Sequence, residues 1–198
     1  MARKAETTKG RILKAALALF STDGFDATSM RAIAKAVGIN VGSIYNHFDS
    51  KEAILYRLYE YYAEQHRKAR PQLDELLKLV ETQSPQKVFE TLEYGYPPEV
   101  SENISRVFMI ASRRVNTDPI SIQFIRENLF DDGEELIIPV LDKMMELGRI
   151  EPIDSRLFAE ILIYHSFCAA SYSNTPFRIQ PENWRVSRKL IFSLIRPR

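Results

Sequence analysis

The chain has 198 residues, of which 45% are hydrophobic and 27% charged, a composition typical of a globular protein with a sizeable core. No apolar run approaches the roughly 20 residues of a membrane span, and residues 1–10 are polar where a signal peptide would be apolar. The single cysteine, Cys168, excludes an intrachain disulfide and fits a reducing compartment, so we expect a cytoplasmic protein.

The net charge of +1 divides unevenly along the chain. Residues 1–48 hold seven Lys and Arg against three Asp and Glu, which gives this segment +4 and leaves −3 for the rest. A basic segment joined to a mildly acidic one is expected where one end of a protein meets phosphate. Chance clustering would give the same imbalance, so the charge carries weight only beside other observations.

The first helix is predicted over about residues 8–22. Ile12, Ala16 and Phe20 fall on one face of it, and Phe25 follows where it can fill a small core. This helix would form the packing base for the segment after it.

Residues 28–48 predict two short helices joined by a tight turn. Thr28 and Ser29 can cap the first of them, and Gly38 can follow it with a positive φ. Asn40 can then cap the second. The pattern therefore predicts a helix-turn-helix.

The second helix of this pair, predicted over residues 41–48, is too short to be stable without packing, so its function would be to present side chains. Ile44 and Phe48 lie four apart and would face the core. Small residues at its start would let the backbone approach base edges in a major groove about 12 Å wide. A surface helix that binds nothing has the same spacing. The residues left facing outward or sideways are Val41, Gly42, Ser43, Tyr45, Asn46 and His47.

A longer helix is predicted over residues 49–69. Asp49 and Ser50 both offer caps, and Asp49 with Glu52 resembles a capping box. Lys51 lies in the first turn, where the helix dipole favours an acid, so its charge suggests a nearby phosphate. A solvated lysine is the alternative. The length of this helix would let it connect the first 48 residues mechanically to the rest.

The stretch GINVGSIYNHFDSKEAIL, residues 38–55, resembles the signature of the tetracycline-repressor (TetR) family of bacterial transcriptional regulators. The resemblance runs from about Thr8 to Leu55, and beyond Tyr62 only the layout is similar. It implies an all-α fold with a three-helix DNA-binding head and a larger helical body for ligand binding and dimerisation. The implied domains are the head at residues 1–48, a connecting helix at 49–69 and the body at 70–198.

The resemblance also assigns roles to residues of the head. Base-edge contact falls to Val41, Gly42, Ser43 and Asn46, and phosphate contact to Thr28, Tyr45, His47 and Lys51. Because Val41 is apolar, its plausible contact is with a thymine methyl group. Ser29 and Arg31 complete the predicted DNA-binding set, although Arg31 could instead pair within the head.

The remainder reads as helical throughout, without strand or hairpin signals. A break at residues 131–133 should separate two of these helices, and Pro139 should kink the second. The helices are predicted over about residues 72–82, 85–92, 99–116, 119–130, 134–147, 157–173 and 182–195.

An effector site is expected within this body, among polar residues set in apolar surroundings. Arg113 and Arg114 could accept an anionic ligand, but they also read as solvated or salt-bridged residues. His165 and Cys168 could form half of a metal site, yet no second pair completes it, so a packed role is favoured and no metal or cofactor is predicted. The candidate ligand-binding residues are Tyr94, Arg113, Arg114, Asn116, Tyr164 and His165.

The helix predicted over residues 157–173 is apolar nearly all round, which exceeds what one domain can cover, and the last helix adds further apolar residues. Paired across a two-fold axis they would make a four-helix bundle between two copies. A buried hairpin in a monomer is the alternative. The predicted interface residues are Phe158, Ile161, Leu162, Phe167, Trp184, Ile191 and Ile195.

We therefore expect a transcriptional repressor. It would bind an inverted-repeat operator as a homodimer, and a small-molecule effector would release it from the DNA. Two reading helices about 34–36 Å apart would meet successive major grooves. An enzyme is disfavoured, because the sequence lacks a glycine-rich phosphate loop, a nucleophile elbow, an HExxH motif and metal-spaced carboxylates. A helical scaffold that binds another protein through residues 157–195 is a third class.

Overall fold

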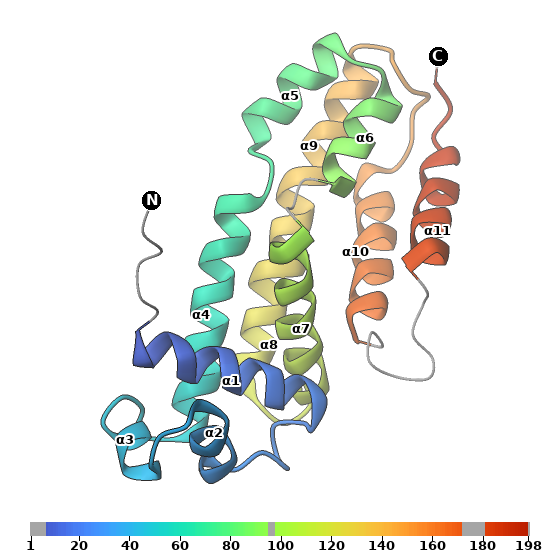
Figure 1. The fold of residues 1–198 in the computed structure, drawn as a ribbon. Coiled ribbons are helices and arrows are strands. Elements are labelled where there is room, and N and C mark those ends of the chain that lie inside the picture. Colours follow the sequence, from blue (N-terminus) through green and yellow to red (C-terminus); the bar gives the residue numbers. More distant parts are fainter. Residues whose placement is uncertain (1–6, 95–97, 172–180, 198) are drawn as a thin grey trace.

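The computed structural model describes residues 7–94, 98–171 and 181–197 and is built from helices (Figure 1). Within these ranges the only extended pairing is an isolated bridge between Ile150 and Pro197. The all-α prediction is confirmed. None of the described helices is both long and apolar enough to cross a bilayer.

Three short helices form the head at one end of the molecule (Figure 1). Their ends are fixed by local side chains: Ser29 Oγ accepts a hydrogen bond from the Ala32 amide at 3.1 Å, and Asn40 Oδ1 accepts one from the Ser43 amide at 2.7 Å. Gly38 ends the second helix with φ of +75°, a conformation that costs glycine little. The three helices are α1 (Thr8–Thr22), α2 (Met30–Val37) and α3 (Val41–Tyr45).

Helix α4 (Lys51–Ala69) leads from the head into the body. Ser50 is its cap, with Oγ accepting a hydrogen bond from the Ala53 amide at 3.0 Å. The capping box predicted for Asp49 and Glu52 is therefore wrong, because the helix begins one residue later than that pairing requires.

The body consists of helices whose bounds lie close to those predicted. Helices α10 and α11 run side by side at its outer edge (Figure 1). The bounds are α5 (Leu73–Thr82), α6 (Pro85–Tyr94), α7 (Pro98–Arg114), α8 (Pro119–Ile125), α9 (Asp132–Glu146), α10 (Ser155–Ser171) and α11 (Pro181–Ser193).

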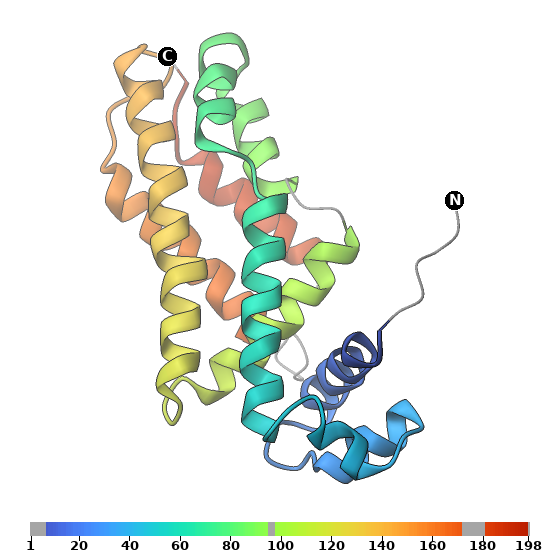
Figure 2. The ribbon, with the colours of Figure 1, turned by 90° about the vertical axis from the view of Figure 1, so that its left-hand side faces the viewer.

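The break predicted at residues 131–133 is wrong. A short π-helical segment, η1 (Arg126–Asp131), joins α8 to α9, and the three form one continuous rod beside α4 (Figure 2). Gly133 lies inside α9, where a Cβ atom would come within 2.7 Å of the Ile163 side chain. The glycine therefore serves close packing of α9 on α10 and not an interruption of the helix.

Two groups of buried side chains hold the fold together. The first combines the head with α4, α7 and α8, and includes Ile44, Leu55 and Phe124. The second lies in the body among α5, α6, α9, α10 and α11, around Leu76 and Leu141. The head thus shares its core with the body, and the domain boundary predicted at residue 48 is not a break in the packing.

The turn at Gly38 gives a prediction about stability. We expect Gly38→Ala to lower the free energy of unfolding by about 1 kcal/mol, because an L side chain is strained at this positive φ. Gly38→Asn should lose less, since asparagine tolerates the left-handed conformation better. Urea unfolding followed by circular dichroism would measure both, and equal stability of all three proteins would contradict the assignment.

Candidate nucleic-acid interface

Helix α3 is held in place by two side chains that face inward. Ile44 is fully buried and Phe48 is buried just beyond the helix, where the Lys9 ammonium lies 5.2 Å from the centre of its ring. Burying an aliphatic side chain of this size contributes roughly 1.5–3 kcal/mol. Since α3 has only five residues, this packing and the Asn40 cap account for its existence.

The face of α3 opposite this core is open to solvent. Gly42, Asn46 and His47 are exposed, and half of the Tyr45 surface is accessible. Val41 and Ser43 are partly covered, the Ser43 hydroxyl donating to Asn40 Oδ1 at 3.0 Å. The helix ends at Tyr45 rather than at Phe48, so Asn46 and His47 lie in the turn after it.

The residues before α2 are differently placed. Ser29 is exposed and caps the helix, and Arg31 is exposed on its first turn. Thr28, by contrast, is buried, and its hydroxyl donates to the Gly24 carbonyl at 2.7 Å. The predicted phosphate contact of Thr28 is at odds with this geometry, because its hydroxyl points into the head.

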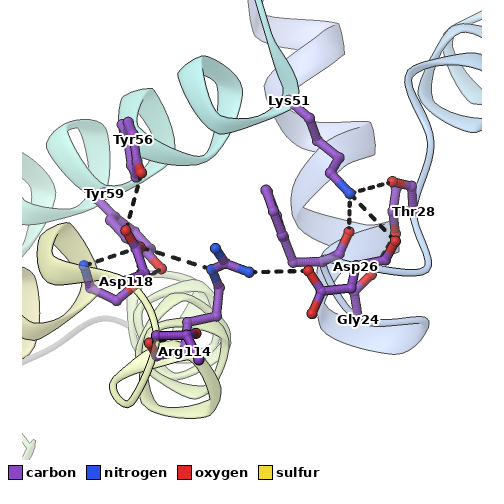
Figure 3. A network of polar contacts seen from close by, with 11 residues as sticks. Gly24, Asp26, Thr28, Lys51, Tyr56, Tyr59, Arg114 and Asp118 are labelled. Carbon is purple, nitrogen blue, oxygen red and sulfur yellow. Dashed lines mark hydrogen bonds and ion pairs between the residues drawn. The ribbon is translucent and has the colours of Figure 1, made fainter.

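Lys51 makes contacts that its sequence position did not predict. Its ammonium donates hydrogen bonds to the carbonyl oxygens of Phe25 at 2.6 Å and Thr28 at 2.9 Å (Figure 3). It also lies 4.2 Å from the centre of the Phe25 ring. A cation at the start of α4 is therefore explained by the turn between α1 and α2, without a phosphate.

Arg114, at the last turn of α7, reaches the same turn from the body side. Its guanidinium carbon lies 4.0 Å from the centre of the Phe25 ring, and one of its nitrogens lies 3.3 Å from Asp26 Oδ1. Its Nε lies 3.8 Å from Asp118 Oδ2. Arg114 therefore forms the salt bridges that the sequence analysis gave as one alternative to an anionic ligand.

Asp118 joins this contact to α4 and α8 (Figure 3). Its carboxylate accepts hydrogen bonds from Tyr56 at 3.1 Å and from the Ser121 hydroxyl at 2.5 Å, and Tyr59 is 2.9 Å from the same hydroxyl. Burial alone would raise the pKa of Asp118, but the hydrogen bonds and the Arg114 charge outweigh it and hold the pKa below its ordinary value. Burial raises the pKa of Tyr59, which stays a neutral hydrogen-bonding group.

Several of these residues were missed from the sequence. The Arg11 guanidinium donates to the Val37 carbonyl and so supports the end of α2. Asp118 caps α8, where its Oδ2 accepts a hydrogen bond from the Ser121 amide. The sequence around Phe25 could not predict that two cations lie beside its ring, since Lys51 and Arg114 are far along the chain.

The structure does not gather the predicted ligand-binding residues into one site. Arg113 and Asn116 are exposed, Arg114 is engaged with the head, and Tyr164 is more than half exposed. His165 Nε2 lies 2.7 Å from the Ser187 hydroxyl, and burial lowers the pKa of its imidazole. The side chain of Tyr94 lies outside the described residues.

His165 and Cys168 do not form a recognisable metal site. Cys168 is exposed, whereas His165 faces α11. Among the described residues no group of three or more His, Cys, Asp or Glu side chains is placed to hold a metal ion.

The predicted dimer residues divide into two sets. Phe158, Leu162 and Ile195 are buried in the core of their own chain, so assigning them to an intermolecular interface is wrong. Ile161 is exposed, Phe167 and Ile191 are partly covered, and the side chain of Trp184 lies outside the described residues. Among the described side chains, the exposed large apolar residues of these two helices are Leu157, Ile161 and Tyr164 on α10 and Val186 and Leu190 on α11, with Leu194 just beyond.

Comparison with known sequences finds a family match in the first third of the chain. Residues 12–58 match the family described as "Bacterial regulatory proteins, tetR family". UidR of Escherichia coli K12, an HTH-type transcriptional regulator, is 47% identical over 55 residues, 28% of each chain. IcaR of Staphylococcus aureus Newman, a negative transcriptional regulator of the biofilm operon icaADBC, is 48% identical over 46 residues, 23% of this chain and 25% of that one. The match thus spans about a quarter of these relatives.

Solved structures resemble the chain over nearly its whole length. PfmR of Thermus thermophilus, a TetR family transcriptional regulator, superposes with a TM-score of 0.69 at 24% identity, over 92% of this chain and 97% of that one. A protein of Saccharomonospora viridis in complex with choline gives a TM-score of 0.67 at 18% identity, over 96% and 98% of the two chains. At such identities the likeness establishes the fold.

The environment of Asp118 gives a prediction about acid stability. Because its pKa is lowered in the folded state, its contribution is present above its ordinary pKa of 3.8 and is lost as the pH falls through the folded value. We expect wild-type stability to fall more steeply between about pH 5 and pH 2 than that of Asp118→Asn. Urea unfolding across this range would measure it, with the exposed Asp142→Asn as the control for loss of one charge. Parallel curves for wild type and Asp118→Asn would contradict the prediction.

Proposed function

We propose, from the match of residues 12–58 to the tetR family of bacterial regulatory proteins, that this chain is a DNA-binding transcriptional regulator whose α3 enters the major groove. The observation that carries the proposal is the presentation of α3: two inward residues hold it to the core while its other face stays open. Gly42 at its leading end allows close approach of the backbone to base edges.

Within this proposal the exposed residues of the head have separate roles. Val41, Gly42, Ser43 and Asn46 meet base edges, with Asn46 the strongest hydrogen-bonding reader. Tyr45 and His47 contact phosphates, as do Ser29 and Arg31 at the start of α2. The excess of positive charge in residues 1–48 would support attraction to the duplex.

We propose that the regulator acts as a homodimer through α10 and α11. Val186, Leu190 and Leu194 recur at four-residue spacing and expose 55%, 63% and 69% of their surfaces. Leu157, Ile161 and Tyr164 form a matching stripe on α10. Such a face can pair with itself across a two-fold axis, which would place two heads on an inverted repeat.

We propose that the protein represses transcription and that a small molecule relieves this repression. IcaR is a negative regulator, and its similarity over 46 residues of this chain favours the same sense here. The choline in the Saccharomonospora viridis protein favours a ligand-responsive body. Release would require that the effector bind one arrangement of the heads more tightly than the other.

In vitro selection from random duplexes with the full-length protein tests the proposed function. The expected result is enrichment of one sequence arranged as an inverted repeat, confirmed by gel shift at several salt concentrations. Failure to enrich any sequence would overturn it, while enrichment of an asymmetric site would retain DNA reading but reject the dimeric arrangement.

The assigned base contacts lead to a prediction on specificity. Asn46→Ala should cost about 1–3 kcal/mol of binding free energy and relax base preference at one position of each half-site. Tyr45→Phe, which removes only a hydroxyl, should weaken binding about uniformly across sequences. Selection repeated with each variant distinguishes the two roles, and an unchanged base preference in Asn46→Ala would reject its assignment.

The exposed stripe leads to a prediction on assembly. The wild type should have a solution mass about twice its 22.9 kDa chain mass. Leu190→Glu should yield a monomer, because it places a charge within the apolar face. Ile122→Glu, which alters an exposed residue on α8, is the control. Light scattering measures all three, and a monomeric wild type or a dimeric Leu190→Glu would count against this interface.

A further inference from the structure

The turn between α1 and α2 is contacted by cations from two helices outside it. Lys51 comes from the start of α4 and Arg114 from the end of α7, and both lie within about 4.2 Å of the centre of the Phe25 ring. Phe25 is itself buried. A cation over an aromatic face is attracted by the ring quadrupole, and more strongly where water is displaced.

The two cations contact different groups of the turn. Lys51 binds backbone, through the Phe25 and Thr28 carbonyls, and so fixes the path of the chain into α2. Arg114 binds side chains, the Phe25 ring and the Asp26 carboxylate. Asp26 is 94% exposed, so water screens that ion pair, and the stacked ring carries more of the contact.

Arg114 also contacts a buried carboxylate of the body, that of Asp118. Its side chain is only 16% exposed, and Asp118, with 6% exposed, lies on its inner side. Because Asp118 also accepts from Tyr56 and Ser121, the guanidinium is tied to α4 and α8 through a carboxylate with fixed partners (Figure 3). The position of the Phe25 turn therefore depends on how α4 and α7 lie against each other.

We propose that Lys51 and Arg114 are positioning residues for the reading helix: together they hold the Phe25 turn and so set the orientation of α2 and α3 relative to the body. Lys51 then acts on DNA binding through the turn and not as a phosphate ligand. Sliding of α4 against α7 would pull the two cations apart and tilt the head. This inference rests on the proposed DNA-binding function for its consequence, but not for the contact itself.

The salt dependence of DNA binding distinguishes a positioning residue from a phosphate ligand. For the duplex enriched by the wild type, Lys51→Met and Arg114→Met should each lower affinity by about 10-fold, a loss typical of hydrogen bonds to charged groups. The slope of log affinity against log salt should stay unchanged. If Lys51 bound phosphate in both protomers, the slope would shrink by about 1.8, or 0.9 for each lysine, and the inference would be overturned.

Matched variants control for the loss of charge and of fold. Lys68→Met, on α4 and 65% exposed, and Arg126→Met, on η1 and 76% exposed, remove a cation away from the turn and should leave affinity within about two-fold. Arg114→Lys keeps the charge but loses the planar stacking group, so it should recover part of the affinity. In a Phe25→Leu background, Arg114→Met should lower affinity by a smaller factor than in the wild type, since the shared ring is gone.

Hydrogen exchange tests the contact without DNA. In full-length Lys51→Met and Arg114→Met, amides of residues 24–40 should exchange faster than in the wild type, while those of α9 and α10 serve as an internal reference. Unchanged exchange in residues 24–40 would overturn the inference. If the wild type enriched no duplex, the proposed function would fail, and the exchange result would still decide whether the two cations hold the turn.

Discussion

The structure depends on the way in which one buried aromatic ring, Phe25, joins the head to the body. Helix α3 is too short to keep its own position, and in the account proposed above the turn before α2 helps to orient both helices. That turn is contacted by Lys51 of α4 and Arg114 of α7. Because the first hydrophobic core also runs from α1 through α4 to α7 and α8, the head is an extension of the body's packing.

The sequence predicted those helix ends that depend on residues only a few positions away. Ser29 begins α2, Gly38 ends it and Asn40 begins α3, as expected, since the two N-caps act on amides three positions away and the glycine takes a positive φ. The prediction failed where the role of a residue depends on a partner far away in the sequence. Gly133 resembles a helix break in sequence, yet it makes room for Ile163, and the partners of Lys51 lie 23–26 residues upstream.

The same limit applies to the two last helices. A helix that is apolar nearly all round does not reveal which side its own chain covers, so Phe158 and Leu162 could not be told from Leu157 and Ile161. Packing against α9 and α7 separates the buried stripe from the open one. The outward-facing residues of α3 were easier to predict, because a short helix with two inward residues leaves few positions for its outer face. The residues proposed for an effector site had no comparable local signal.

A single reading helix of this length contacts too few bases to be selective, so the proposed function requires two heads at a fixed separation. Hydroxyl-radical footprinting of the full-length protein on a selected duplex tests this most directly. We expect two groups of protected sugars, symmetric about a dyad, with centres about 34–36 Å apart along the helix axis. A single protected patch without a dyad would contradict reading by two symmetric heads.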